Sequence, residues 1–389
     1  MKLIPYGYHW IDNEDIKEVI KVLKADWITQ GPKIKEFENA LCQYTGARYA
    51  VVVSSGTAAL HIACLAVGIQ KKDEVITSPI TFVASANCVL YCGGRPIFAD
   101  IQEDTVNIEP EEIKDKITKK TKAIIPVHFA GHPCDLEEIY TIAKKYNLII
   151  IEDACHALGA EYKGSKIGSC KYSDLTVFSF HPVKSITTGE GGAILTNNKK
   201  LYEKLLMLRN HGITKDPTKF TINYQPSTIN DYGSWYYEMQ ELGFNYRITD
   251  FQCALGLSQL KKLNKFIQRR REIVEIYNKE LSKIDEITLP KERPYVKSSW
   301  HIYYIRLKNS QRRKEVFERL RKKGLGVQVH YIPVHLQPYY RNNFGYKEGD
   351  YPKAENYYSS TITLSLYANL KKKAVSSILN KVKHTIIDK

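Results

Sequence analysis

The chain has 389 residues, of which 43% are hydrophobic and 25% charged, so it has the composition of a globular protein and the length for two or three domains. Its 57 Lys and Arg against 42 Asp and Glu give a net charge of +15, which suits a nucleic-acid surface, an anionic substrate or lysine-rich helix faces. Without a low-complexity tract or a long uncharged apolar stretch, a largely disordered chain and a membrane segment are not expected.

The N-terminal residues show no basic start followed by an apolar run, so we expect a cytoplasmic protein. Eight cysteines are scattered without a CxxC pair, which favours free buried thiols over a disulfide framework. His128 and His132 are four residues apart, but Gly131 and Pro133 indicate a loop, and no third ligand is close in sequence. No metal site is therefore expected.

From about residue 48 to 200, short apolar runs alternate with amphipathic stretches. This alternation is typical of an α/β domain with a largely parallel sheet. We expect helices at 57–67, 135–146 and 201–209. We expect strands at 49–53, 74–78, 96–100, 123–127, 148–152 and 175–180, and a further strand after the glycine turn within 187–197.

The second half of the chain has a different residue pattern. Residues 213–242 are rich in Tyr, Thr, Asn and Gly with little periodicity, which indicates a long functional loop. A long helix is expected from 249 to about 282, and strand, helix and strand are expected at 301–307, 312–323 and 327–331. These elements predict a large domain over 1–250 and a smaller α+β domain over 251–389.

The most basic run, KKLNKFIQRRR at 261–271, falls inside that long helix. The apolar residues recur at helical spacing, with the cations between them, and this predicts a solvated helix face. These residues are Leu260, Leu263, Phe266 and Ile267. A nucleic-acid surface would also be expected to show a recognised module or interleaved aromatic residues, and neither is present.

The turn Ser54, Ser55, Gly56, Thr57 joins a predicted strand to a predicted helix. Free backbone N–H groups and the helix dipole at such a turn bind anions such as phosphate, and a plain N-cap is the alternative. There is no GxGxxG or GxxxxGK[ST] motif, which removes the main support for a dinucleotide site or a P-loop.

Asp153 ends an apolar run, and Lys184 follows the predicted strand at 175–180 in a loop with Pro182 and Gly189. In open α/β sheets, ligands bind beyond the carboxyl ends of the strands. A carboxylate there can keep a pyridinium nitrogen protonated, and a lysine of lowered pKa can attack a carbonyl and act as a base. Alone, Asp153 could equally be a turn residue, and a lysine in such a loop is more often a plain surface residue. Their order after the phosphate turn favours a pyridoxal-phosphate site.

Longer stretches carry a family resemblance: SGTAAL at 55–60, TSPITFVASAN at 77–87, EDACHALGA at 152–160, SFHPVKSITTGEGG at 179–192 and GFNYRITDFQCALGLSQL at 243–260. They resemble the DegT/DnrJ/EryC1/StrS sugar aminotransferases over nearly the whole chain. The resemblance implies a fold-type I aminotransferase that uses pyridoxal 5′-phosphate. It also implies a mostly parallel seven-stranded sheet in the large domain, a smaller C-terminal α+β domain, and a homodimer with shared active sites.

The resemblance also assigns roles to single residues. Lys184 would form the Schiff base, Asp153 would pair with the ring nitrogen, and His156, where many relatives carry Gln, would bind the ring hydroxyl. The remaining cofactor contacts would be Phe82 on the ring and Ser55, Gly56, Thr57, Ser179 and, from the other subunit, Asn245 on the phosphate. The substrate contacts would be Tyr6, Asp26, Trp27, Ile28, Thr29, Arg247, Val329, His330 and Tyr331, with packing or a helix start as the alternative role of Arg247.

Within the family, HPVKSITTGEGG at 181–192, IPYG at 4–7, DWITQGP at 26–32 and WYYEMQELGFNYR at 235–247 are most similar to the pseudaminic-acid branch. This implies transfer of an amino group from L-glutamate to C4 of UDP-2-acetamido-2,6-dideoxy-β-L-arabino-hex-4-ulose. The alternatives are an aminotransferase of the GDP-perosamine or UDP-4-amino-arabinose type, a non-catalytic ligand-binding regulator, and a basic nucleic-acid-binding protein. The presence of both Lys184 and Asp153 disfavours a non-catalytic regulator. A nucleic-acid-binding protein would show an affinity for DNA that depends strongly on salt.

Overall fold

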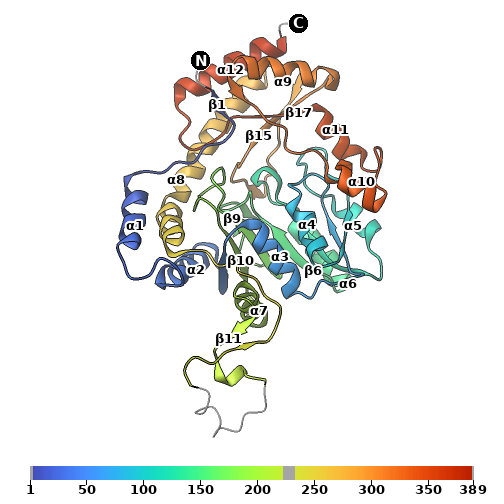
Figure 1. Ribbon diagram of the computed structural model, residues 1–389. Helices are drawn as coiled ribbons and strands as arrows, with labels where there is room; N and C mark the ends of the chain where they lie inside the picture. The colour runs from blue at the N-terminus through green and yellow to red at the C-terminus, as the bar shows by residue number, and fades with distance from the viewer. Residues whose placement is uncertain (1–2, 222–232, 388–389) are drawn as a thin grey trace.

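The computed structural model describes residues 3–221 and 233–387. A seven-stranded sheet forms its centre, in the order β2-β10-β9-β6-β5-β3-β4. All neighbouring strands are parallel except that β10 runs antiparallel to both β2 and β9, so the expected mostly parallel sheet is confirmed (Figure 1). The strands are β2 (Tyr49–Val53), β3 (Glu74–Thr77), β4 (Arg95–Phe98), β5 (Thr121–Ile125), β6 (Ile149–Asp153), β9 (Leu175–Ser179) and β10 (Gly192–Thr196).

Helices cover both faces of this sheet. On each face, an apolar core fills the space between the sheet and its helices. In β2, Val51 and Val53 enter one core, whereas Ala50 and Val52 enter the other. A strand buried on both faces needs an unbroken apolar run rather than alternation, which is why the strand pattern was readable in the sequence. One core includes residues of α3 (Gly56–Ala66), α4 (Ala84–Tyr91) and α7 (Lys199–Arg209); the other includes residues of α2 (Pro32–Thr45), α5 (Pro110–Lys116), α6 (Leu136–Tyr146) and α8 (Asp250–Leu281).

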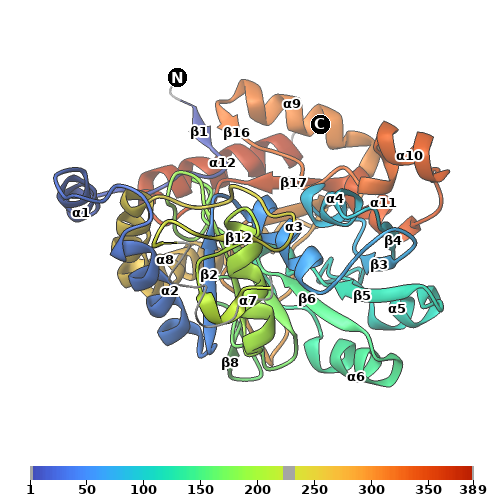
Figure 2. The same ribbon diagram turned by 60° about the horizontal axis from the view of Figure 1, so that its bottom comes forward.

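The long helix α8 leads from the large sheet to a separate three-stranded sheet of order β13-β15-β17, which has an apolar core of its own. Helix α1 (Asn13–Leu23) lies against α8 at the rim of the molecule (Figure 2). The C-terminal elements are β13 (Ile287–Thr288), β15 (Tyr303–Leu307), α9 (Arg313–Lys322), α10 (Pro338–Phe344), α11 (Pro352–Ser360), β17 (Thr361–Leu364) and α12 (Lys372–Ile387).

Small sheets connect distant parts of the chain. The first strand, β1 (Ile4–Pro5), pairs in parallel with β16 (Leu325–Gly326), so the start of the chain lies against its C-terminal part. Strand β7 (Glu161–Tyr162) pairs with both β8 (Ser165–Lys166) and β14 (Val296–Lys297). None of the helices described is both long enough and apolar enough to cross a bilayer.

The long loop predicted at 213–242 is partly described. Residues 213–221 and 233–242 extend from the body beyond α7 (Figure 1), and β11 (Ile213–Thr214) pairs with β12 (Glu238–Met239). The remaining part of that prediction, 222–232, lies outside the described residues.

Two expectations from the sequence are wrong. Residues 327–331 do not form a strand beyond a single bridge from Gln328 to Thr363, because the chain turns there and brings the Tyr331 hydroxyl 3.2 Å from Nε2 of His156. The basic face of α8 is also not wholly solvated, since Arg270 is only 2% exposed. Its guanidinium donates to the carbonyl oxygens of residues 300, 301 and 366, and these neutral acceptors replace water.

Candidate active site

A cavity of about 410 Å³ opens at the carboxyl ends of β6 and β9. The cavity lies at this edge because the ends of the parallel strands, and the loops that follow them, gather on one side of the sheet. Three stretches that are far apart in the sequence meet there: the turn before α3, the end of β6, and the loop after β9. The predicted residues that line this cavity are Tyr6, Ser55, Gly56, Thr57, Phe82, Asp153, His156, Ser179, Lys184, His330 and Tyr331.

Lys184 lies in the loop after β9, where its backbone N–H donates to the His181 carbonyl at 2.9 Å. Burial in the cavity lowers the pKa of the Lys184 amine, and the nearby Cys155 and Asp153 act in the opposite direction. Because desolvation disfavours the charged form, a larger share of this amine is neutral than for an exposed lysine. A neutral amine can attack a carbonyl or accept a proton.

Asp153 is 5% exposed, and donors hold both of its oxygens. Ser85 Oγ donates to Oδ2 at 2.5 Å, and the Cys155 backbone N–H donates to Oδ1 at 3.1 Å. The Ser85 hydroxyl also lies 2.7 Å from Oγ1 of Thr81. These hydrogen bonds fix the orientation of the carboxyl group, which lines the cavity. Ser85 was not predicted, because a serine in the first turn of a helix carries no signal of such a contact.

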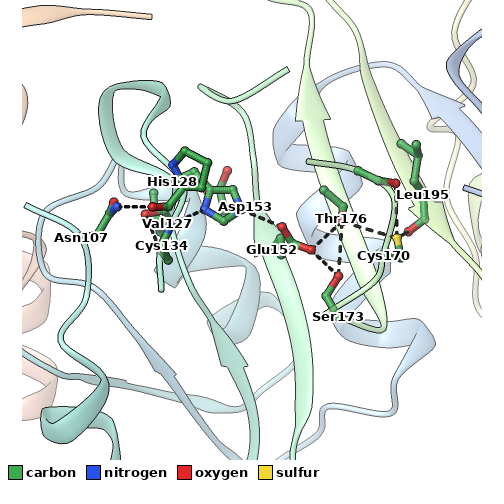
Figure 3. A network of polar contacts seen from close by, with 12 residues as sticks. Asn107, Val127, His128, Cys134, Glu152, Asp153, Cys170, Ser173, Thr176 and Leu195 are labelled. Carbon is green, nitrogen blue, oxygen red and sulfur yellow. Dashed lines mark hydrogen bonds and ion pairs between the residues drawn. The ribbon is translucent and has the colours of Figure 1, made fainter. Parts of the chain in front are cut away.

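A buried polar network lies beside Asp153 (Figure 3). Oε2 of Glu152 lies 2.7 Å from Nε2 of His128, and Oε1 accepts hydrogen bonds from the hydroxyls of Thr176 and Ser173. Because Nδ1 of His128 accepts from the Cys134 backbone N–H at 3.0 Å, the proton of a neutral His128 must be on Nε2. The network links the loop after β5 to the end of β6 and to the start of β9. The described residues hold no group of His, Cys, Asp and Glu placed to bind a metal.

The turn before α3 contains the N-cap residue of that helix, and it also lies close to β9. Ser55 Oγ accepts from the Ala58 backbone N–H at 3.1 Å, so the capping interpretation is correct. A Cβ atom at Gly56 would lie 2.8 Å from Cβ of Ser179, so glycine lets the start of α3 approach β9 closely. The resulting cradle combines the positive end of a helix with the hydroxyls of Ser55, Thr57 and Ser179, which fits a phosphate group.

Neutral aromatic side chains form another wall. The ring of His156 lies 4.2 Å from that of His301, measured between centroids. Burial, followed by the charge of Lys184, lowers the pKa of His156 well below its usual value, and burial also lowers the pKa of His330 to about 4. These imidazoles are therefore uncharged at neutral pH. His301 was not predicted, since nothing in the sequence marks a histidine just before β15 as part of a site.

The other predicted residues do not line this cavity. Arg247 instead borders a second cavity of about 350 Å³, together with residues 30, 31, 35 and 209, and its guanidinium donates to Oδ1 of Asn210 at 2.5 Å. The backbone of Asn245 forms an isolated antiparallel β-bridge with that of Asn210, and Thr29 forms another with Thr249. The residues outside the first cavity are Asp26, Trp27, Ile28, Thr29, Asn245, Arg247 and Val329.

Comparisons with known proteins agree with this geometry. Residues 9–383 match the DegT/DnrJ/EryC1/StrS aminotransferase family. A Campylobacter jejuni UDP-4-amino-4,6-dideoxy-N-acetyl-β-L-altrosamine transaminase is 42% identical over 98% of this chain and 99% of that protein.

Two solved structures are similar as well. Helicobacter pylori PseC, an aminotransferase involved in the biosynthesis of pseudoaminic acid, aligns with a TM-score of 0.89 and 35% identity over 99% of both chains. The PMP-form of the sugar aminotransferase Spr1654 from Streptococcus pneumoniae aligns with a TM-score of 0.90 and 32% identity over 98% of both chains. With sequence, fold and cavity in agreement, the chain belongs to the DegT/DnrJ/EryC1/StrS aminotransferase family.

Proposed function

We propose that this aminotransferase uses pyridoxal 5′-phosphate to move an amino group from L-glutamate to C4 of UDP-2-acetamido-2,6-dideoxy-β-L-arabino-hex-4-ulose. The observation that carries the proposal is that Lys184, Asp153 and the turn at Ser55, Gly56 and Thr57 line one cavity. The name of the Campylobacter jejuni relative supports the choice of sugar, and the PMP-form of Spr1654 supports the choice of cofactor.

The residues of the cavity fit the parts of this cofactor. The carboxylate of Asp153 would face the ring nitrogen, His156 the ring hydroxyl, and Phe82 a face of the ring. The phosphate would bind in the cradle of Ser55, Gly56, Thr57 and Ser179. When bound, the cofactor supplies an electron sink for the bond broken at the amino-group carbon. Asp153 would favour a protonated ring nitrogen, because a carboxylate beside that nitrogen stabilises its positive charge.

Lys184 performs the proton transfers in both halves of a ping-pong reaction. Its amine accepts the proton from Cα of glutamate in the first half and delivers a proton to C4 of the sugar in the second. The lowered pKa of Lys184 suits both tasks, since a larger neutral share of the amine can accept a proton and a less basic amine releases it more readily.

The nucleotide sugar would enter beside Tyr6, His330 and Tyr331, which line the cavity from the part of the molecule where β1 meets β16. Hydroxyl and neutral imidazole groups suit the hydroxyl and N-acetyl groups of a sugar. We propose that Val329 shapes the same segment. Arg247, which borders the second cavity, and the segment Asp26, Trp27, Ile28 and Thr29 would meet substrate at a subunit boundary.

The active form would be a symmetric homodimer. Asn245 does not line the cavity of its own subunit, which supports the proposal that it completes the phosphate site of a second copy. Trp27 and Ile28 are 61% and 52% exposed, and contact with a second copy would cover such side chains. Within each subunit we propose a cofactor domain over 1–250 and a smaller domain over 251–389, since the latter has its own sheet and core.

The substrate is tested by a side-by-side comparison of kcat/KM for the proposed UDP sugar, its C5 epimer, GDP-4-keto-6-deoxymannose and UDP-4-keto-arabinose, with glutamate as donor and product mass as the readout. The proposed sugar should react best, because polar groups left unpaired by a wrong sugar cost about 10⁴-fold in discrimination. A tenfold advantage for any other sugar would refute the substrate assignment. Product formation by Lys184→Ala at the wild-type rate would refute the mechanism.

A further inference from the structure

A glutamate lies inside the central sheet, directly before Asp153, and the proposed chemistry does not use it. Ile150 and Glu152 of β6 share one face of the sheet, because alternate residues of a strand point the same way, and Ile150 belongs to the apolar core on that face. Glu152 is 2% exposed and does not line the cavity. For the core alone, an apolar side chain of similar volume would serve at least as well.

The side chain of Glu152 crosses β6 from one neighbouring strand to the other (Figure 3). Toward β5, its Oε2 accepts from Nε2 of His128 at 2.7 Å. Toward β9, its Oε1 accepts from the hydroxyl of Thr176 at 3.0 Å and from that of Ser173. His128 and Thr176 are fully buried and do not line the cavity either, so none of these groups is placed to touch a ligand.

The same two neighbouring segments hold the backbone around Asp153. The backbone N–H of His128 donates to the Asp153 carbonyl at 3.1 Å, and the N–H of Asp153 donates to the Pro126 carbonyl at 2.9 Å. On the other side, the residue after Asp153 donates to the Val177 carbonyl at 2.9 Å. Glu152 therefore joins the two segments that flank Asp153 at the point where the chain leaves the sheet.

We propose that Glu152 is a positioning residue of this aminotransferase, which holds the end of β6 through its three hydrogen bonds and so keeps the Asp153 carboxyl group at the place of the cofactor's ring nitrogen. Such placement matters, because a displacement of about 1 Å at a reacting group costs about 10²-fold in rate. The effect on turnover rests on the proposed function, whereas the effect on the position of Asp153 does not.

The network separates hydrogen bonding from charge. Nδ1 of His128 accepts from the Cys134 backbone N–H, so Nε2 carries the proton and needs an acceptor. The hydroxyls of Thr176 and Ser173 can rotate and accept a hydrogen bond instead of donating one. Glu152→Gln can therefore turn its carbonyl oxygen toward the imidazole and its amide NH2 toward the hydroxyls. Glu152→Met fills a similar volume and makes none of these contacts.

The test compares these two variants in the cofactor-loaded enzyme. Glu152→Gln should stay within about 3-fold of the wild-type kcat. Glu152→Met should lower kcat about 10- to 100-fold with little change in the KM for glutamate, because no substrate contact is lost. It should also shift the absorption band of the bound cofactor. In crystal structures of the purified variants, the Asp153 carboxyl should lie farther from Ser85 Oγ than the present 2.5 Å in Glu152→Met only.

A second buried pair provides the matched control. Nε2 of His335 lies 2.9 Å from Oε1 of Glu355, His335 is fully buried, and neither residue lines the cavity. Glu355→Met should lower the melting temperature but leave the kcat and the absorption band of the folded enzyme unchanged. If Glu152→Met does not fold, Thr176→Val decides, because it removes one donor and keeps the volume. Its kcat should fall about 3- to 10-fold.

Wild-type kcat with Asp153 in place, in folded Glu152→Met or otherwise in Thr176→Val, would overturn the proposal. Equal losses in Glu152→Gln and Glu152→Met would also overturn it, because the charge and not the hydrogen bonds would then be what acts. A wild-type enzyme without transaminase activity would instead contradict the proposed function, and the position of Asp153 in the crystal structures would still decide the role of Glu152.

Discussion

At the scale of single residues, the proposed chemistry depends on one amine in a desolvated position. Burial lowers the pKa of Lys184, and its neighbours are a carboxylate and neutral aromatic groups rather than other cations. The purified protein should therefore be yellow, and borohydride reduction should remove the absorption band of the lysine-bound cofactor. Lys184→Ala should lack this band and lose at least about 10³-fold in turnover.

The matched control for this prediction is Lys171→Ala, which changes an exposed lysine and should leave colour and rate unchanged. A wild-type protein that stays colourless after incubation with pyridoxal 5′-phosphate would show that Lys184 does not bind the cofactor.

Ser85 gives a second prediction at this scale. Its hydroxyl donates to a buried carboxylate, and a hydrogen bond to a charged group contributes about 1.5–3 kcal/mol. Ser85→Ala should therefore lower kcat about 10- to 100-fold with a small change in the KM for glutamate, because Asp153 loses its orientation rather than a substrate contact. Steady-state kinetics check this, with Ser359→Ala, at a partly exposed serine away from the cavity, as control. A purely structural role would instead lower the melting temperature and leave kcat of the folded enzyme intact.

At the scale of elements, the long helix α8 connects the large sheet to the C-terminal sheet through Arg270. This buried cation has no carboxylate partner among its described hydrogen bonds and donates only to carbonyl oxygens. Arg270→Met should lower the free energy of unfolding by about 1–3 kcal/mol, since the carbonyls lose their donor while the cost of burying a charge also disappears. Urea unfolding measures the change.

The control on the same helix is Lys265→Met, at an exposed position, which should stay within about 0.5 kcal/mol of wild type. Equal stability of the two variants would mean that packing, and not the guanidinium, joins α8 to residues 300, 301 and 366.

At the scale of the whole molecule, the proposed dimer predicts complementation. Lys184→Ala and Asn245→Ala homodimers should both be inactive. When their subunits exchange at random, about a quarter of all sites should regain activity, because half of the dimers are hybrids and each hybrid contains one intact site. Turnover per site after mixing, together with mass analysis of the hybrids, checks this. Proven exchange without recovery would place Asn245 in the site of its own subunit.

Much of this architecture could be predicted from the sequence, because its signals are local. Apolar runs buried on both faces gave the strands of the central sheet, and the expected strand at 49–53 coincides with Tyr49–Val53. The long helix was expected from 249 to about 282 and is observed at Asp250–Leu281. That Asp153 and Lys184 lie at one cavity could be predicted, because polar residues at the ends of parallel strands gather at one edge of the sheet.

Tertiary contacts decided the rest. The sequence determined which residues form strands and helices and which polar residues end them, since periodicity and caps act over a few neighbours. Only the packed structure placed Ser85 on Asp153, turned residues 327–331 out of the sheet toward His156, and buried Arg270 against backbone carbonyls. Each of these contacts joins residues more than 25 positions apart, so no local pattern encodes it. The physical reason is that burial and hydrogen-bond partners are properties of the assembled core and not of a segment.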